Sequence, residues 1–110
     1  PDQDHGEKHS VFAPFFATDK STLTTPARIA KLGRACAFPI MVFFDAATGI
    51  YQVKVEPALE DFGALNPQED ATNMNASFER LIRQYPTQYM WLLKLFRTRP
   101  TKGDNPYLKP

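Results

Sequence analysis

Acidic and histidine side chains near the start of the chain are the first candidates for chemistry. Asp2 and Asp4 are separated by one residue, and His5 and His9 follow closely. Carboxylates at this spacing can chelate a hard cation, as in metal-dependent glycosyltransferases, whereas imidazoles suit a softer metal. Polar clusters in loops are also commonly solvated or hydrogen-bonded to the backbone. The cluster therefore leaves two interpretations open, a metal site and a solvated loop.

The C-terminal end combines an aromatic side chain with basic ones. Trp91 is followed by Arg97, Arg99 and Lys102. Tryptophan favours the headgroup level of a bilayer, and each cation near an anionic leaflet contributes about 1 kcal/mol. The alternative is that Trp91 packs into the core and leaves a solvated basic tail. We predict that these four residues contact a membrane or an anionic headgroup.

Charge is distributed unevenly along the chain, although the net charge is only +1. Residues 45–79 carry seven acidic side chains against Lys54 alone, and residues 80–110 carry seven basic ones against Asp104 alone. A net charge this close to zero indicates no nucleic-acid partner. The basic C-terminal end, by contrast, favours contact with an anionic surface. With 43% hydrophobic residues the composition is that of a globular domain. No apolar run reaches the ~18 residues that span a bilayer.

Prolines and glycines indicate where the structural elements begin and end. Residues 1–20 are predicted to form a strand exit followed by loops, with a short extended segment over residues 11–16, an apolar patch that Pro14 interrupts. A short helix is predicted to begin near Pro26, with Thr25 as its N-cap, and to end at Gly33. The longest helix is predicted from Asn66-Pro67 to Tyr85, and a second helical segment over residues 88–96.

An apolar run and an alternating run predict two strands between these helices. Residues 37–44 are continuously apolar, which is typical of a strand that is buried on both faces in the middle of an α/β sheet. Residues 50–56 alternate, with Tyr51, Val53 and Val55 on one face of a half-buried strand. The short connection predicts an antiparallel hairpin. The fold class predicted is α/β.

Eight short motifs follow one another in an order that resembles one known family, the lipid A biosynthesis acyltransferases of the late lauroyl/myristoyl type. The resemblance covers essentially the whole chain. The motifs are Pro1-Asp2-Gln3-Asp4, Val11-Phe12-x-Pro14-Phe15-Phe16, Thr22-x-Thr24-x-Pro26-Ala27-Arg28-x-Ala30, Gly49-x-Tyr51, Glu56-Pro57, Phe78-Glu79-x-Leu81-Ile82-Arg83, Tyr85-Pro86-x-Gln88-Tyr89-x-Trp91-Leu92 and Phe96-Arg97-Thr98-Arg99-Pro100.

The resemblance implies an acyltransferase at the cytoplasmic face of the bacterial inner membrane. Such an enzyme moves a fatty acyl chain from acyl carrier protein to a lipid A precursor, so the implied partners are that carrier, that precursor and the membrane surface. No cofactor is implied beyond the carrier-bound acyl donor. The implied fold is part of a glycerolipid-acyltransferase-like sheet flanked by helices, with a C-terminal antiparallel hairpin. Residues 1–110 would form the C-terminal part of a single acyltransferase domain.

The catalytic signature of the family, a histidine with an acid five positions later, is absent from this sequence. Ser10 and Pro14 stand at that distance from the two histidines, so the resemblance implies that the catalytic residues lie upstream of Pro1 and that the fragment alone is inactive.

The residues expected to line the substrate site are Asp2, Gln3 and Asp4, because a motif that leaves a strand end faces the ligand crevice of an α/β sheet. Arg28 either contacts a phosphate or satisfies the dipole at a helix C-terminus. Three other functions remain open. They are an acyltransferase for another glycolipid, a metal-dependent glycosyltransferase that uses Asp2-x-Asp4, and a non-catalytic membrane-docking module.

Overall fold

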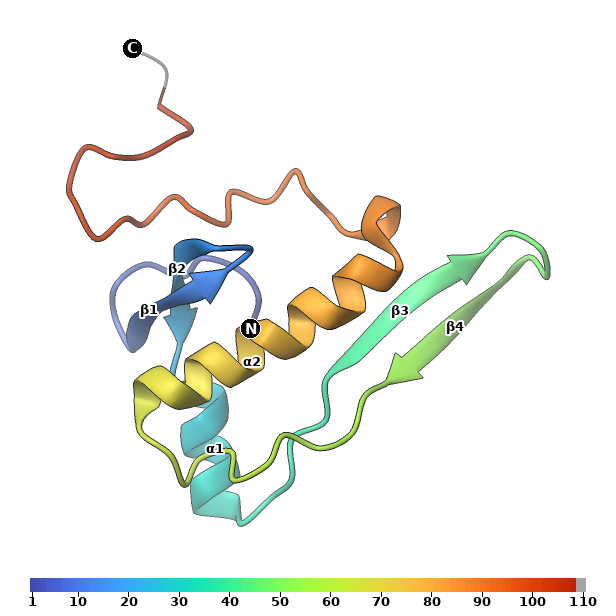
Figure 1. Ribbon diagram of the computed structural model, residues 1–110, viewed down its shortest axis with the longest axis horizontal. Coiled ribbons are helices and arrows are strands. Elements are labelled where there is room, and N and C mark those ends of the chain that lie inside the picture. Colours follow the sequence, from blue (N-terminus) through green and yellow to red (C-terminus); the bar gives the residue numbers. More distant parts are fainter. Residues whose placement is uncertain (109–110) are drawn as a thin grey trace.

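The computed structural model describes residues 1–108 and has the α/β architecture that the sequence predicts. In the view of Figure 1 the long helix runs between two separate two-stranded antiparallel sheets. The elements in chain order are β1 (Ser10–Phe15), β2 (Thr18–Leu23), α1 (Thr25–Gly33), β3 (Ile40–Asp45), β4 (Ile50–Val55), α2 (Pro67–Gln84) and the 3₁₀ helix η1 (Pro86–Gln88).

The first hairpin, β1–β2, confirms the predicted extended segment over residues 11–16, most of which lies in β1, but contradicts the prediction of loops around it. Ser10 pairs with Leu23 at one end and Phe15 with Thr18 at the other. Phe16 and Ala17 form the two-residue turn with φ of 47° and 62°. Turns of this kind normally contain glycine or asparagine, and neither is present here. The sequence therefore lacks the usual signal for this hairpin.

Helix α1 begins and ends close to where the sequence predicts. It runs from Thr25 to Gly33, and Arg34 follows in the left-handed conformation with φ of 49°. The predicted N-cap is wrong by one residue, because Thr24 occupies that position. The Thr24 hydroxyl makes no cap and instead donates to the His9 carbonyl at 3.0 Å, which joins the helix entrance to β1.

The second hairpin confirms the predicted antiparallel pairing but not the predicted burial. β3 pairs with β4 from Ile40↔Val55 to Asp45↔Ile50, and within residues 1–108 it pairs with no other strand. The prediction of a strand buried on both faces is wrong, since its residues alternate between exposed and half-buried. In β4 the face that carries Val53 is the exposed one, because the polar face is turned toward α2.

Helix α2 confirms the longest predicted helix. The Asn66 side chain accepts a hydrogen bond from the Glu69 backbone N–H at 2.9 Å, and Pro67 follows at the first helical position. Its buried face includes Leu81 and Ile82, and Ile82 packs with Phe15 of β1 and with Leu95 after η1. The helix thus ties the first hairpin to the C-terminal segment.

The segment after η1 contradicts the predicted second helix over residues 88–96. Tyr89 is extended, with φ of −80° and ψ of 143°, and a series of turns follows. The Trp91 indole N–H donates to the Pro86 carbonyl at 2.6 Å, and Leu95 is buried against Phe15. Tertiary packing outweighs the helical preference of these apolar residues. In Figure 1 the segment returns past the first hairpin.

Candidate functional site

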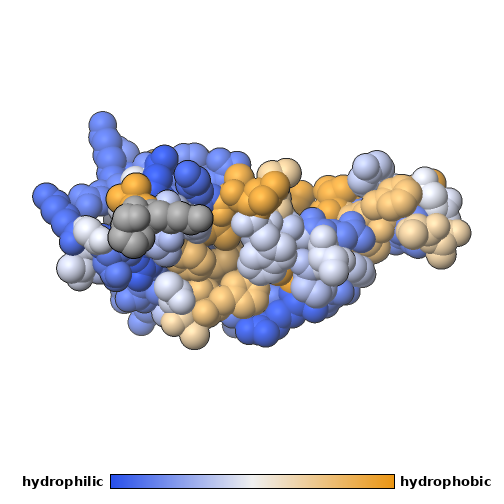
Figure 2. All heavy atoms as spheres, turned by 90° about the horizontal axis from the view of Figure 1, so that it is seen from above, coloured by the Kyte–Doolittle hydropathy of each residue, from blue (hydrophilic) through white to orange (hydrophobic). Residues whose placement is uncertain are grey.

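An apolar cavity of about 530 Å³ lies among α2, the start of β3 and the segment after η1. Its α2 wall includes Met74, Phe78 and Leu81, whereas Ile40 and Leu93 come from the two other elements. The volume falls in the usual range for ligand sites. Figure 2 shows the hydrophobic residues extending from the middle of the molecule to the end formed by β3–β4. No lysine or arginine lines the cavity among the described residues.

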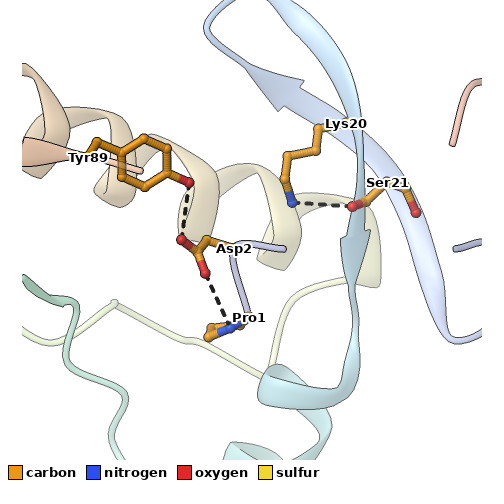
Figure 3. Close-up of polar contacts among 5 residues, drawn as sticks. All are labelled: Pro1, Asp2, Lys20, Ser21 and Tyr89. Carbon is orange, nitrogen blue, oxygen red and sulfur yellow. Dashed lines mark hydrogen bonds and ion pairs between the residues drawn. The ribbon is translucent and has the colours of Figure 1, made fainter. Parts of the chain in front are cut away.

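Asp2 lies at this cavity and pairs with Tyr89, which also lines it. The Tyr89 hydroxyl donates to Asp2 Oδ2 at 3.1 Å (Figure 3). Burial raises the pKa of Tyr89 well above its usual range, and the charge of Asp2 and this hydrogen bond raise it further. Tyr89 therefore stays protonated at neutral pH and remains a donor to Asp2.

Lys20 of β2 is a buried cation next to this pair and was not predicted from the sequence. Its side chain is 1% exposed, and Nζ donates to the Ser21 carbonyl at 3.3 Å (Figure 3). Burial lowers the pKa of Lys20, while the charges of Asp2 and Asp4 oppose that shift. Because no strand was predicted over residues 18–23, no strand pattern indicated that this lysine would be buried.

Asp4 does not line the cavity and instead fastens the C-terminal segment. Its carboxylate accepts hydrogen bonds from the Thr98 backbone N–H at 2.6 Å, the Thr98 hydroxyl at 2.8 Å and the Gly6 N–H at 2.9 Å. Burial alone would raise the pKa of Asp4. These hydrogen bonds and the charge of Arg97 outweigh burial and lower the pKa below its usual value.

Gln3 and Arg28 lie away from this cluster. Gln3 is exposed and does not line the cavity. Arg28 is exposed in the first half of α1, so the interpretation that it satisfies the dipole at the helix C-terminus is wrong. Lys31 is the basic residue in the last turn of that helix. Of the four predicted substrate-binding residues, the structure therefore places only Asp2 at the cavity.

The predicted membrane-contact residues occupy two neighbouring features. Trp91 is 52% exposed and follows Met90, which is also exposed, so the interpretation that Trp91 packs into the core is wrong. A hollow of about 490 Å³ is lined by Arg97, Arg99 and Lys102, among other residues. Arg99 has a structural contact as well, since its guanidinium donates to the Asp19 carbonyl at 2.6 Å.

The acidic and histidine cluster gives no support to the metal interpretation. Across residues 1–108 no three histidine, cysteine or acidic side chains are grouped so that they could hold a metal ion. The oxygens of Asp4 are already hydrogen-bonded to Thr98 and Gly6. Over the same range, no helix has the length and apolar character needed to cross a bilayer.

Comparison with known proteins identifies a family and several relatives. Residues 1–98 match the family described as bacterial lipid A biosynthesis acyltransferase. The chain is 38% identical over 107 residues to the lipid A biosynthesis myristoyltransferase of Escherichia coli K12, covering 97% of this chain and 33% of that protein. It is 38% identical over 104 residues to a lipid A biosynthesis acyltransferase of Haemophilus influenzae, covering 94% of this chain and 32% of that protein. It is 31% identical over 109 residues to the lipid A biosynthesis palmitoleoyltransferase of E. coli K12, covering 98% of this chain and 35% of that protein. The chain spans about one third of the length of these relatives.

Proposed function

Because the chain belongs to the bacterial lipid A biosynthesis acyltransferase family, we propose that it forms about one third of an enzyme that transfers a fatty acyl chain to a lipid A precursor. The observation that carries this proposal is the family match over residues 1–98. The relatives that match are described as lipid A acyltransferases, and none supports another glycolipid or a nucleotide sugar as substrate. The catalytic histidine and acid belong to the part of the enzyme outside this chain.

The apolar cavity forms one wall of the site for an acyl chain. Its walls are side chains such as Met74, Phe78, Leu81 and Met90. Each methylene group of an acyl chain gains about 0.8 kcal/mol when it leaves water. The cavity is open, and the rest of the enzyme completes it. In the full protein these elements belong to a domain with a larger sheet of the glycerolipid-acyltransferase type.

The polar groups at the cavity hold the head of an amphiphilic substrate. The carboxylate of Asp2 lies at the cavity, and Tyr89 fixes its orientation through the 3.1 Å hydrogen bond. The buried ammonium group of Lys20 offsets part of the negative charge of Asp2 and Asp4. A carboxylate held in this way accepts a hydrogen bond from a substrate hydroxyl. Asp2 is thus a binding residue and does not replace the catalytic base.

The enzyme works at the cytoplasmic face of the inner membrane, with acyl carrier protein as donor and no further cofactor. Support comes from the exposed apolar side chains of Trp91 and Leu92, the latter 94% exposed, beside a basic hollow. Arg97 and Lys102 are exposed there, whereas Arg99 is partly engaged with β2. The two exposed cations are therefore the stronger candidates for contact with anionic headgroups.

A chimaera tests this function. The chain replaces the corresponding third of the E. coli myristoyltransferase in a strain that lacks that enzyme, and lipid A is analysed by mass spectrometry. We expect acylation to return. Asp2→Asn should lower transfer about tenfold, as expected for the loss of a charged hydrogen-bond acceptor. Asp104→Asn, which changes an exposed tail carboxylate, is the matched control and should have no effect.

Two results test the acyl-transfer function and the membrane contact separately. Normal accumulation of the chimaera without any acylated product would contradict the assigned function. A double variant with Arg97→Gln and Lys102→Gln should reduce the membrane-bound fraction at low salt. An unchanged fraction would contradict the membrane contact while leaving the acyl-transfer function in place.

A further inference from the structure

One face of the β3–β4 hairpin is apolar and uncovered. Three of its strand pairs place their side chains on that face, and all six side chains are hydrophobic. Exposure ranges from 43% for Phe44 to 75% for Tyr51, with Val53 at 61%. The pairs are Ile40↔Val55, Val42↔Val53 and Phe44↔Tyr51. We call these six residues the hairpin face. A contiguous apolar surface of this kind marks an interaction site.

The opposite face of the same hairpin contacts the C-terminal end of α2 and its C-cap. Phe43 stacks on Tyr85 with ring centroids 3.9 Å apart, and Lys54 donates a hydrogen bond to Gln84. The hairpin therefore turns its more polar side toward α2, whereas its wholly apolar side is exposed, with Ile40 and Val42 also lining the apolar cavity. A two-stranded hairpin is marginally stable by itself and needs a covered hydrophobic face. The hairpin face is the surface that a partner would cover.

Charge argues against an anionic membrane as that partner. Asp45 ends β3, Glu56 follows β4, and Glu60 and Asp61 come next, whereas Lys54 is the one basic residue of segment 45–79. An anionic leaflet attracts lysine and arginine and repels such a segment. A second copy of the same surface would bring the two acidic borders together. The basic residues that suit a membrane lie in the C-terminal segment instead.

The length of the relatives indicates which protein surface covers the hairpin face. The chain spans 33% of the E. coli myristoyltransferase, so about two-thirds of such an enzyme lies outside the aligned region. We propose that the hairpin face packs against that remaining two-thirds of the full-length enzyme. This inference rests on the proposed function in one respect, namely that the chain works as part of a longer acyltransferase.

Hydrogen bonds at the edge of β3 indicate that the hairpin contacts the rest of the enzyme through side chains on its face. The Gln88 side chain accepts from the Phe44 N–H at 2.6 Å and donates to the Phe44 carbonyl at 2.9 Å. Its amide thus occupies the position that a neighbouring strand would take at Phe44. Side chains of the hairpin face, such as Val53, therefore make the contact rather than backbone groups at Phe44.

A photo-crosslinking experiment on the full-length enzyme in native membranes tests this packing. Tyr51 is replaced by p-benzoylphenylalanine, which keeps an aromatic ring, and the products are mapped by mass spectrometry. Thr48, exposed in the turn of the same hairpin, carries the probe in the matched control. We expect a crosslink within one polypeptide, from Tyr51 to a residue outside the aligned third, and its loss in the Thr48 variant. A lipid adduct, a crosslinked dimer, an adduct to another protein or the absence of any crosslink would each overturn the proposal.

A smaller probe covers the case in which the large one disturbs folding. In a Cys36→Ser background, Val53→Cys should react with a maleimide about tenfold more slowly than Thr48→Cys, because reaction at a packed site needs local opening. Equal rates would overturn the proposal. Acyl transfer is measured in the same preparations. An active enzyme with an unprotected Val53→Cys contradicts the packing alone, and a protected but inactive enzyme contradicts the function alone.

Discussion

The two hairpins have strands of equal length but differ in what surrounds them. Each of the four strands has six residues. β1–β2 places Phe15, Lys20 and Thr22 in the interior, against α2 and the C-terminal segment. β3–β4 leaves three apolar pairs in contact with water. The comparison shows that strand pairing alone does not make a core, because burial depends on what packs on each face.

Polar contacts also distinguish the first hairpin from the second. Asn75 of α2 is buried and donates to the Pro14 carbonyl at 3.2 Å and to the Thr22 hydroxyl at 2.9 Å, so it reaches both strands of the first hairpin. The second hairpin is held by the Phe43–Tyr85 stack and by side-chain amides at its surface. The first region is complete within this chain, and the second is not.

The largest expected effect comes from Gly63, which lies between α1 and α2. It has φ of +90°, and an added Cβ would lie 2.6 Å from the Ala27 carbonyl oxygen. Gly63→Ala should lower the free energy of unfolding by roughly 3 kcal/mol, from overpacking and left-handed strain together. Gly49→Ala, in the turn of the second hairpin with φ of +73° and no atom within 4 Å, is the control and should show the strain alone. Equal losses in denaturant titration would contradict this account of Gly63.

The next effect concerns the buried amide of the first region. Asn75→Ala should cost about 1–3 kcal/mol, because the Pro14 carbonyl and the Thr22 hydroxyl lose a buried partner. Asn73→Ala, on the exposed side of the same helix, changes helix propensity similarly and serves as the control. If thermal unfolding of the two variants coincided, the amide would not tie the hairpin to α2.

A smaller effect is expected at the edge of the second hairpin. Gln88→Ala removes both hydrogen bonds to the Phe44 backbone and should cost about 1 kcal/mol. Amide exchange should accelerate at Phe44 while Phe15 in β1 stays unchanged. Acceleration in both hairpins would mean that the two regions unfold together.

The smallest expected effect is the release of the C-terminal segment from Asp4 at low pH. The pKa of Asp4 is lowered in the folded protein, so its stabilising contribution is present above the unfolded value of about 4 and is lost as pH falls below it. The Thr98 amide resonance should shift as pH falls through this range. Asp4→Asn should abolish the shift, and Asp104→Asn should retain it. A Thr98 resonance that does not titrate would contradict the role of Asp4 as the fastening group.

The sequence predicts best where local signals and burial agree. Asn66-Pro67 marks the start of α2 correctly, because the cap and the proline act locally. The run over residues 37–44 predicts a strand but not its environment, since burial on both faces requires neighbours that this chain does not supply. The β1–β2 turn lacks glycine and asparagine, so the sequence predicted an extended segment over residues 11–16 but not its pairing with residues 18–23. Asp2 is singled out by the sequence and lies at the cavity, whereas Tyr89 and Lys20 come next to it only through tertiary packing.

Hydrogen–deuterium exchange on the 110-residue chain tests the central claim most directly, namely that one hairpin is complete and the other depends on a partner. Amides of β1, β2 and α2 should exchange about 100-fold more slowly than those of β3 and β4, because a region without cover opens locally at low free-energy cost. In the full-length enzyme the β3–β4 amides should become protected while those of β1–β2 change little. Equal protection of both hairpins in the isolated chain would contradict the claim.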